Sequence, residues 1–209
     1  SQDDVVQFLL SVLEWARKGF LYETLAHVVE NPLMTFKNVI ADDEEKEETS
    51  PVRSYNHFLK KGIGWGKERY IACVERVENS EKDSQDEKKH TYFNTFLRCM
   101  VDVFSNPCDC GEVYRKLLEL SKTYLVKTKK KNEILSVLKG ELPVLQHAKA
   151  ETEEECLRLV YEHLKGLGIS DSKREDAVSV MKYGKLEVLE RPHQFIIGLS
   201  AKQLAADAK

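Results

Sequence analysis

Apolar side chains recur every three or four residues along most of the chain, which is the spacing typical of amphipathic helices. The first such segment covers about residues 3–18, and Gly19 predicts its end. Its apolar positions are Val5, Val6, Leu9, Leu10, Leu13 and Ala16. Two more helices are expected to follow with almost no loop: one reaches Asn31, and Pro32 begins the other, which extends to Ile40. Helices spaced this closely are typical of helical hairpins and bundles.

The same spacing predicts helices over the rest of the chain. Their approximate ranges are 52–61, 67–78, 91–105, 112–126, 132–139, 152–165, 172–183 and 193–207. The alternation of strands and helices that builds a parallel sheet is absent from the pattern, although β-branched residues keep a strand open for 67–78. We therefore expect an all-α fold, either an irregular multi-helix bundle or a short α-solenoid-like array, with about ten helices.

A polar segment at residues 79–90 interrupts this pattern. It reads NSEKDSQDEKKH and contains no large apolar residue, so it has no hydrophobic face to bury. We expect a flexible charged loop that separates an N-terminal helical subdomain, 1–78, from a C-terminal helical subdomain, 91–209. One continuous domain is the alternative.

Composition and charge narrow the class of protein. The 209 residues include 32 basic and 35 acidic side chains, and a net charge of −3 gives no general attraction to nucleic acid. No apolar stretch reaches the roughly 18 residues of a membrane span, so we expect no membrane association. A chain of this length needs no disulfides, and its cysteines are expected to be reduced. They are Cys73, Cys99, Cys108, Cys110 and Cys156. These features predict an intracellular protein, nuclear or cytoplasmic.

Catalytic, cofactor and metal motifs are missing from the chain. There is no G-x-S-x-G nucleophile, no P-loop and no pair of histidines four residues apart. The glycine-rich run at 62–66 (GIGWG) lacks the spacing of a dinucleotide-binding loop. Cys108 and Cys110 form C-x-C, not the C-x₂-C pair of a zinc site. We therefore predict no catalytic residue, no cofactor and no metal, and a protein that is not an enzyme.

Large apolar side chains in two regions are candidates for binding a protein partner. Trp65 lies within the glycine-rich run, where it either packs on the core or stands exposed as an anchor, and tryptophan is enriched at binding hot spots. The last expected helix is apolar on more than one side. The candidate residues are Trp65, Phe58, Phe195, Ile196 and Leu199. The expected function is a non-enzymatic protein–protein interaction or scaffold domain of an intracellular multiprotein complex, with a homo-oligomer as one form of it.

A lysine cluster supports a second hypothesis. It consists of Lys127, Lys129, Lys130 and Lys131, just past a predicted helix end, where the helix dipole alone favours lysine. The same ammonium groups could contact nucleic-acid phosphates, and such binding would weaken steeply with salt. Tyr124 is the only aromatic residue near the cluster, and binding of single-stranded nucleic acid usually needs several aromatic side chains, so this observation weakens that form of the hypothesis. A helical nucleic-acid-associated domain is therefore the alternative function.

Overall fold

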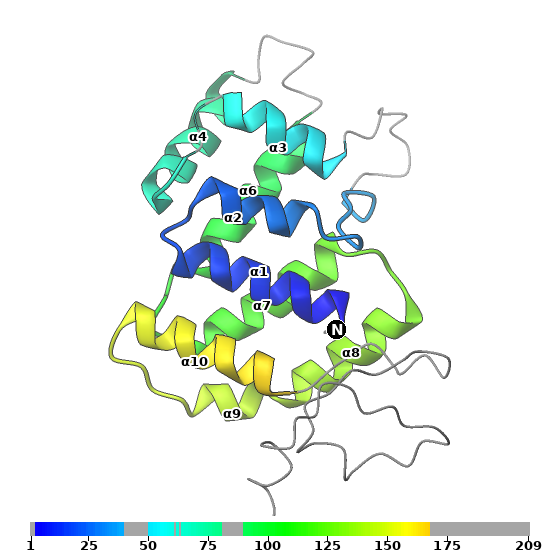
Figure 1. The fold of residues 1–209 in the computed structure, drawn as a ribbon, viewed down its shortest axis with the longest axis vertical. Helices are drawn as coiled ribbons and strands as arrows, with labels where there is room; N and C mark the ends of the chain where they lie inside the picture. Colours follow the sequence, from blue (N-terminus) through cyan, green and yellow to red (C-terminus); the bar gives the residue numbers. More distant parts are fainter. Residues whose placement is uncertain (1–2, 40–49, 61, 63, 81–89, 168–209) are drawn as a thin grey trace, which may run out of the picture. The chain divides into compact units, whose positions relative to one another are not determined.

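The computed structural model describes residues 3–39, 50–60, 62, 64–80 and 90–167, all within one compact unit, Ser1–Asp171. Its helices are α1 (Asp4–Arg17), α2 (Tyr22–Val29), α3 (Pro51–Lys60), α4 (Lys67–Ser80), α6 (Thr91–Val103), α7 (Cys110–Tyr124), α8 (Lys129–Gly140), α9 (Leu142–Gln146) and α10 (Glu153–Gly166) (Figure 1). These described parts contain helices and turns, with isolated bridges and no strand, which confirms the all-α class. The predicted helices at 172–183 and 193–207 lie outside them, so the number of about ten helices and the solenoid-like arrangement stay predictions.

Helix α1 is the central element of this unit. The Asp3 carboxylate accepts a hydrogen bond from the Val5 amide at 2.8 Å and begins the helix, and Gly19 and Phe20 end it in the left-handed region, at φ 69° and 60°. Such a φ is costly for phenylalanine, but burial of its ring against Trp15 at 4.8 Å offsets the strain. Helices α2, α7 and α10 all pack on α1.

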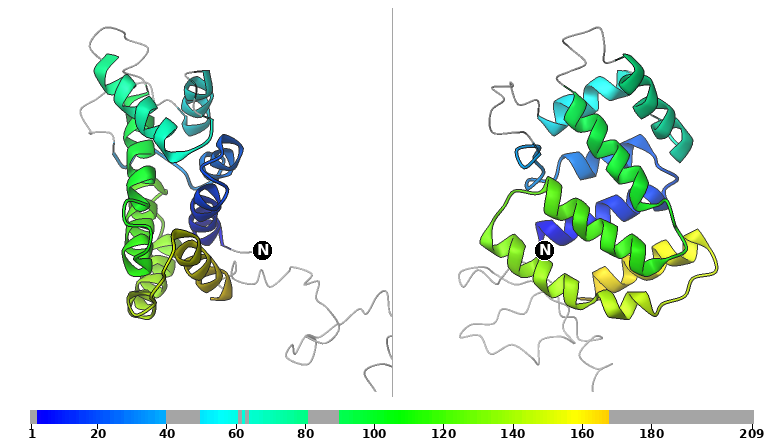
Figure 2. Two further views of the ribbon diagram at one scale, coloured as in Figure 1. Left: turned by 90° about the vertical axis from the view of Figure 1, so that its left-hand side faces the viewer. Right: turned by 180° about the vertical axis from the view of Figure 1, so that it is seen from behind.

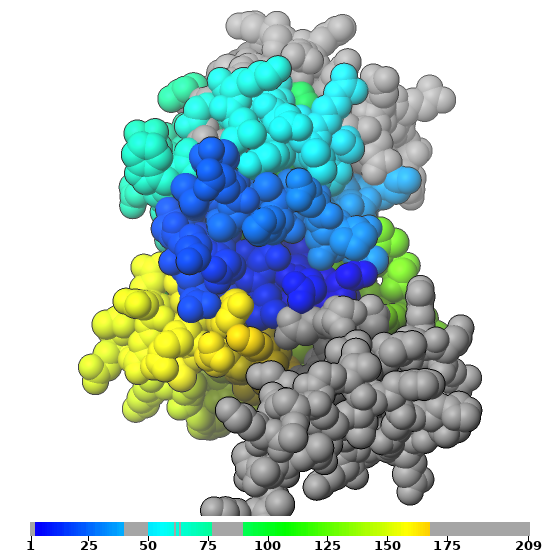
Figure 3. Space-filling view, viewed as in Figure 1, coloured from blue at the N-terminus to red at the C-terminus, as the bar shows by residue number. Residues whose placement is uncertain are grey.

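The helices of the unit lie in two layers. Helices α1, α2 and α10 occupy one layer, and α6 and α7 pass behind them in the other (Figure 2). In the space-filling view, α1 and α2 cross the middle of one face, between α3 and α10 (Figure 3). Because α1 packs against neighbours in both layers, its apolar residues are buried on more than one side.

One hydrophobic core cluster contains residues from before and after the predicted boundary at 79–90. Trp15 of α1 makes edge-to-face contact with Tyr70 of α4 at 5.0 Å, and its indole N–H donates to the Tyr70 hydroxyl at 3.4 Å. Phe104, which follows α6, lies 5.8 Å from Phe20 in the same group of rings. Residues 81–89 of the expected loop lie outside the described residues.

The helix expected from Pro32 to Ile40 is wrong over its described part, 32–39, which forms turns. The Thr35 amide donates to the Tyr124 carbonyl at 2.8 Å, and the Val126 amide donates to the Leu33 carbonyl at 2.8 Å. These backbone groups bind the end of α7 instead of making the i to i−4 bonds of a helix. The apolar side chains that suggested a helix are spaced along a turn instead. Hydrogen bonds to a distant part of the chain satisfy the backbone groups of this turn, so it does not need to form a helix.

Candidate functional site

The glycine-rich turn between α3 and α4 is described at Gly62 and at residues 64–66. Gly62 and Gly66 have φ of 95° and 84°, a backbone conformation that residues with a β-carbon rarely adopt. A β-carbon at either position would meet no heavy atom closer than 3.6 Å. The turn therefore requires these glycines for backbone conformation and not for space.

Hydrogen bonds fix the backbone of this turn to the connection between α1 and α2. The Gly66 amide donates to the Gly19 carbonyl at 2.9 Å, and the Tyr22 amide donates to the Gly64 carbonyl at 2.8 Å. The hydroxyl of Tyr55 then donates to the Tyr22 carbonyl at 2.9 Å, which connects α3 to the same place. These bonds fasten Gly64 and Gly66 to a connection that lies more than forty residues earlier in the chain.

Trp65 stands at the surface of this fixed turn. Its side chain is 61% exposed, the largest exposed fraction among the large apolar residues of the described chain. The guanidinium of Arg69 lies 4.2 Å from the centre of the indole ring, a cation–π contact that covers one face. Trp65 is therefore a surface residue and not a core residue.

A shallow groove continues from the base of the turn along α4. It has a volume of about 410 Å³ and its lining residues are Lys67, Ile71, Val74, Glu75, Arg98, Val101, Asp102 and Ser105. Its floor is apolar and its rim carries both signs of charge, an arrangement common in protein-binding surfaces. Ile71 is among the exposed apolar residues of α4.

The other predicted partner-binding residues lie elsewhere. Phe58 is 1% exposed, and its ring packs on Phe93 with centroids 5.0 Å apart, so it belongs to the core and offers no surface. Helix α6 covers this side of α3, and the sequence pattern alone did not indicate that contact. Phe195, Ile196 and Leu199 lie outside the described residues.

The lysine cluster occupies a different place from the one expected. Helix α8 begins at Lys129, where Thr128 accepts a hydrogen bond from the Lys131 amide at 3.0 Å, so three lysines lie in its first turn. The lysines follow the end of α7 at Tyr124, as expected, but the next helix begins at Lys129 and not near residue 132. A helix N-terminus disfavours cations, and other contacts must offset this cost.

Two lysines of the cluster bind protein oxygens. Lys131 is 2% exposed, and its ammonium donates to the Leu125 carbonyl at 2.8 Å and the Lys122 carbonyl at 3.4 Å, at the end of α7. Burial lowers the pKa of Lys131, and the charge of Lys127 lowers it further. Lys130 forms an ion pair with the buried Asp3 carboxylate at 2.8 Å. The cluster therefore joins α8 to α7 and to the start of α1.

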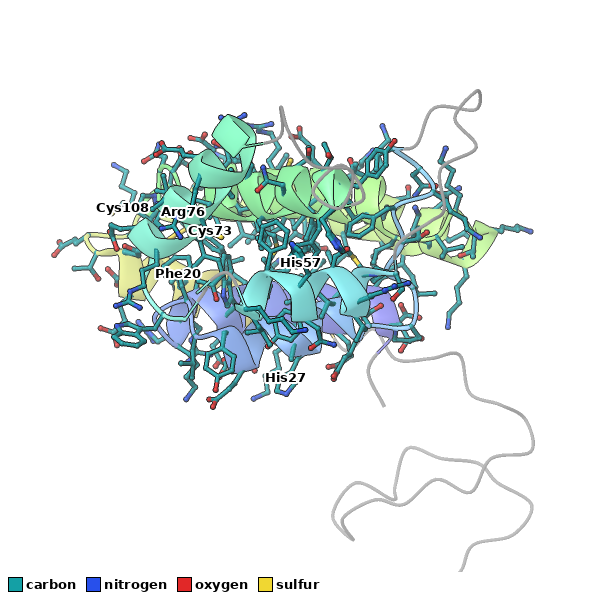
Figure 4. All side chains as sticks on the ribbon, turned by 90° about the horizontal axis from the view of Figure 1, so that it is seen from above. Phe20, His27, His57, Cys73, Arg76 and Cys108 are labelled. Atoms are coloured by element: carbon teal, nitrogen blue, oxygen red, sulfur yellow. The ribbon has the colours of Figure 1, made fainter. Side chains whose placement is uncertain are left out.

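A buried serine–histidine pair was not foreseen from the sequence. The Ser54 hydroxyl lies 3.0 Å from Nδ1 of His90, and the ring of His57 stacks on His90 at a centroid distance of 4.0 Å. Figure 4 shows His57 between α3 and α6, whereas His27 projects from the outer side of α2. Ser54 is fully buried, so no substrate reaches its hydroxyl in this conformation. Ser54 and His90 are 36 positions apart in the sequence, so no local pattern indicated the pair.

Within residues 3–39, 50–60, 64–80 and 90–167, no group of three or more histidine, cysteine, aspartate or glutamate side chains is arranged to hold a metal ion. No helix in this part of the chain has the length and apolar character needed to cross a bilayer.

Comparison of the chain with protein-family models, with curated proteins and with solved structures found no match. The helices and the hydrophobic core of the described residues define the protein as all-α.

Proposed function

We propose that this protein is a non-enzymatic helical interaction module and that Trp65 anchors its protein partner. One observation carries the proposal: a 61% exposed tryptophan stands on a turn whose backbone is fixed by hydrogen bonds to the α1–α2 connection. Tryptophan is enriched at hot spots because it buries a large area with few rotatable bonds. Because the backbone groups of Gly64 and Gly66 are already hydrogen-bonded, the residues on either side of Trp65 lose little conformational entropy on binding, so more of the contact energy appears as affinity.

The remaining parts of the proposal are a scaffold role in a multiprotein complex and an intracellular location, nuclear or cytoplasmic. Cys99, Cys108, Cys110 and Cys156 are present as thiols, which supports a reducing compartment. Burial of the indole by a partner contributes about 1–2 kcal/mol, a five- to thirtyfold effect on the dissociation constant. A homo-oligomer is the form of the proposal in which a second copy supplies the partner surface.

The nucleic-acid alternative receives less support. The ammonium groups of Lys130 and Lys131 bind Asp3 and the end of α7, and the exposed Lys129 lies 3.9 Å from the Glu133 carboxylate. Phosphate binding without Lys130 and Lys131 would depend on Lys127 and Lys129 alone.

The test is an affinity enrichment from cell extract, which compares the proteins bound by the full chain with those bound by two variants. Trp65→Ala removes the anchor, and Val144→Ala removes an apolar side chain of similar exposure, 57%, on α9. We expect a stoichiometric protein partner that survives high salt, bound at least about fivefold less tightly by Trp65→Ala and equally by Val144→Ala. Equal circular dichroism spectra would show that both variants fold, and sedimentation of the purified chain tests self-association.

Retention of the same partner by Trp65→Ala would contradict the role of the anchor. Recovery of nucleic acid that is lost at high salt, with no protein partner, would favour the alternative function.

A further inference from the structure

One exposed face of α4 carries two arginines and begins beside Trp65. Arg69 and Arg76 are seven positions apart, which places them on the same side of the helix, about 10 Å from each other along its axis. Both are exposed, and so is Ala72 between them, whereas Tyr70 is buried against α1. Figure 1 shows α4 at one edge of the unit, where it packs mainly on α6. The two arginines therefore lie at the surface.

The guanidinium groups of these arginines have donors that the described protein leaves unused. Neither group forms an ion pair or a hydrogen bond with another residue in the part of the chain that the structure describes. Arg69 instead lies 4.2 Å from the centre of the Trp65 ring, which orders its guanidinium. A guanidinium presents its N–H groups as a planar fork that fits a carboxylate, and it keeps this ability when it stacks on an aromatic ring.

The charge around this face is opposite to that of the whole chain. Residues 60–76 contain five basic and two acidic side chains, whereas the 209 residues have a net charge of −3. The two acidic residues, Glu68 and Glu75, are also exposed and seven positions apart, so they follow one edge of the arginine face. The positive charge of α4 is therefore concentrated on a narrow strip.

We propose that the partner anchored by Trp65 binds this face through an acidic peptide segment, whose carboxylates pair with Arg69 and Arg76 while an apolar side chain packs on Trp65. This is the partner of the proposed function, on which the inference rests. Tryptophan and arginine are both enriched at binding hot spots. Arginine–carboxylate pairs are frequently bidentate, which gives the contact geometric specificity. Two turns of a helix in the partner would separate its carboxylates by the same distance of about 10 Å.

The acidic edge of the face favours a peptide over a nucleic acid. A nucleic-acid backbone carries a negative charge at every phosphate, so Glu68 and Glu75 would repel it where it passed their side of the helix. A peptide can place acidic residues opposite the arginines and neutral residues opposite these two glutamates. The alternation of charge on α4 therefore fits an acidic peptide better than a continuous row of phosphates.

The experiment selects short random peptides, displayed on phage, for binding to the immobilised full chain. The enriched peptides are synthesised with a fluorescent label, and their affinities for the full chain and its variants are measured by fluorescence anisotropy. We expect aspartate and glutamate next to large apolar residues in these peptides. Raising sodium chloride from about 50 mM to about 500 mM should weaken binding without abolishing it, because salt screens the ion pairs and leaves the apolar contact of Trp65.

The double variant Arg69→Gln/Arg76→Gln tests the two positive charges. We expect it to bind the selected peptides at least about fivefold more weakly than the full chain does. The matched control is Arg115→Gln/Arg158→Gln, which removes two exposed arginines from α7 and α10 and changes the net charge equally. This control should bind the peptides as tightly as the full chain.

Two single variants separate charge from folding and from the stacked ring. Arg76→Gln leaves the contact between Arg69 and Trp65 in place and should weaken binding about two- to threefold. Glu75→Gln removes a negative charge beside the arginines and should strengthen binding about twofold. A gain in affinity cannot come from a variant that fails to fold.

The outcomes distinguish the acidic partner from the anchor itself. Selected peptides that need Trp65 but bind Arg69→Gln/Arg76→Gln normally, or that are enriched in basic residues, would overturn the acidic partner and leave the anchor intact. Selected peptides that bind Trp65→Ala as tightly as the full chain would contradict the proposed function and this inference together. Binding of oligothymidylate that the arginine double variant loses would assign the face to nucleic acid instead.

Discussion

Lys116 shows how a single side chain joins two helices. Its ammonium lies on α7 and binds the Asp102 carboxylate at 2.9 Å, the Asp102 carbonyl at 2.9 Å and the Ser105 hydroxyl at 2.7 Å, near the end of α6. Glu112, one turn earlier, adds a contact of 3.3 Å. Burial lowers the pKa of Lys116, but the hydrogen bonds and charges of Asp102 and Glu112 outweigh burial and raise the pKa above its usual 10.5.

We predict that Lys116→Met lowers the free energy of unfolding at neutral pH by about 1–2 kcal/mol, because the stem still packs while the oxygens lose their donor. A folded-state pKa above the unfolded value stabilises the protein in full below about pH 10.5, and this contribution is lost as the pH rises through the folded pKa. The difference between wild type and variant in urea unfolding should therefore shrink above that pH.

Lys129→Met is the matched control for this prediction. Lys129 also pairs with a glutamate one turn away, Glu133, but at 3.9 Å and with 93% of its side chain exposed, against 15% for Lys116. Its replacement should change the free energy of unfolding by no more than about 0.5 kcal/mol. Equal losses in the two variants would contradict the role of Lys116 in joining α6 to α7.

At the scale of elements, the connection between α3 and α4 depends on its glycines. Gly66 begins the turn into α4 with φ of 84°, and its amide binds Gly19. Gly140 at the end of α8 has no positive φ, and a β-carbon added there would meet nothing within 4 Å. Gly66 is therefore needed for its backbone conformation, whereas Gly140 has no such requirement and serves as the comparison.

We predict that Gly66→Ala lowers the free energy of unfolding by about 1–2 kcal/mol, because alanine disfavours the left-handed region. Gly140→Ala should leave the stability unchanged or raise it by up to about 1 kcal/mol, since alanine favours a helix. Urea unfolding of both variants measures the contrast. A loss in Gly140→Ala equal to that in Gly66→Ala would show that backbone strain is not the cause.

At the scale of the whole described unit, buried tyrosines connect the layers. Burial raises the pKa of Tyr55 and of Tyr70 to about 12, and for Tyr70 it outweighs the opposing hydrogen bond from Trp15. Burial also raises the pKa of Tyr114 and Tyr124. These hydroxyls bind partners on α1, α2, α6 and α8. Ionisation of any of them in place would put a charge in the core.

We therefore predict cooperative alkaline unfolding. The unfolded chain releases tyrosine protons near pH 10 and the folded chain does so only at higher pH, so stability is complete below pH 10 and falls as the pH rises toward 12. The part of the tyrosinate absorbance that comes from these buried residues should appear together with the loss of helical circular dichroism. In Tyr70→Phe, unfolding between these values should release one proton fewer, which makes the fall less steep. Tyrosinate absorbance from these buried residues while the helices persist would contradict the prediction.

Local sequence determined most of the helices, because helical periodicity and capping act within a few residues. The start of α10 is an example: the hydroxyl of the N-cap residue Thr152 accepts from the Glu155 amide at 3.2 Å, and the Glu155 carboxylate accepts from the amide of Glu151, one residue before the N-cap, at 3.0 Å. The six apolar positions predicted for α1 are all buried, but the pattern missed Phe8, Val12 and Trp15, which are buried as well. The all-α class follows from such signals alone.

Only the tertiary structure decided which side chains are exposed. Trp65 stands at the surface and Phe58 does not, although the two lie seven residues apart, because α6 covers one and no described helix covers the other. Lys131 is buried because the end of α7 supplies carbonyl oxygens to its ammonium. Cys110 and Cys156 are buried because α7 and α10 pack on each other and on α1. Exposure and contact depend on elements that are distant in the chain, and no local pattern of residues encodes their arrangement.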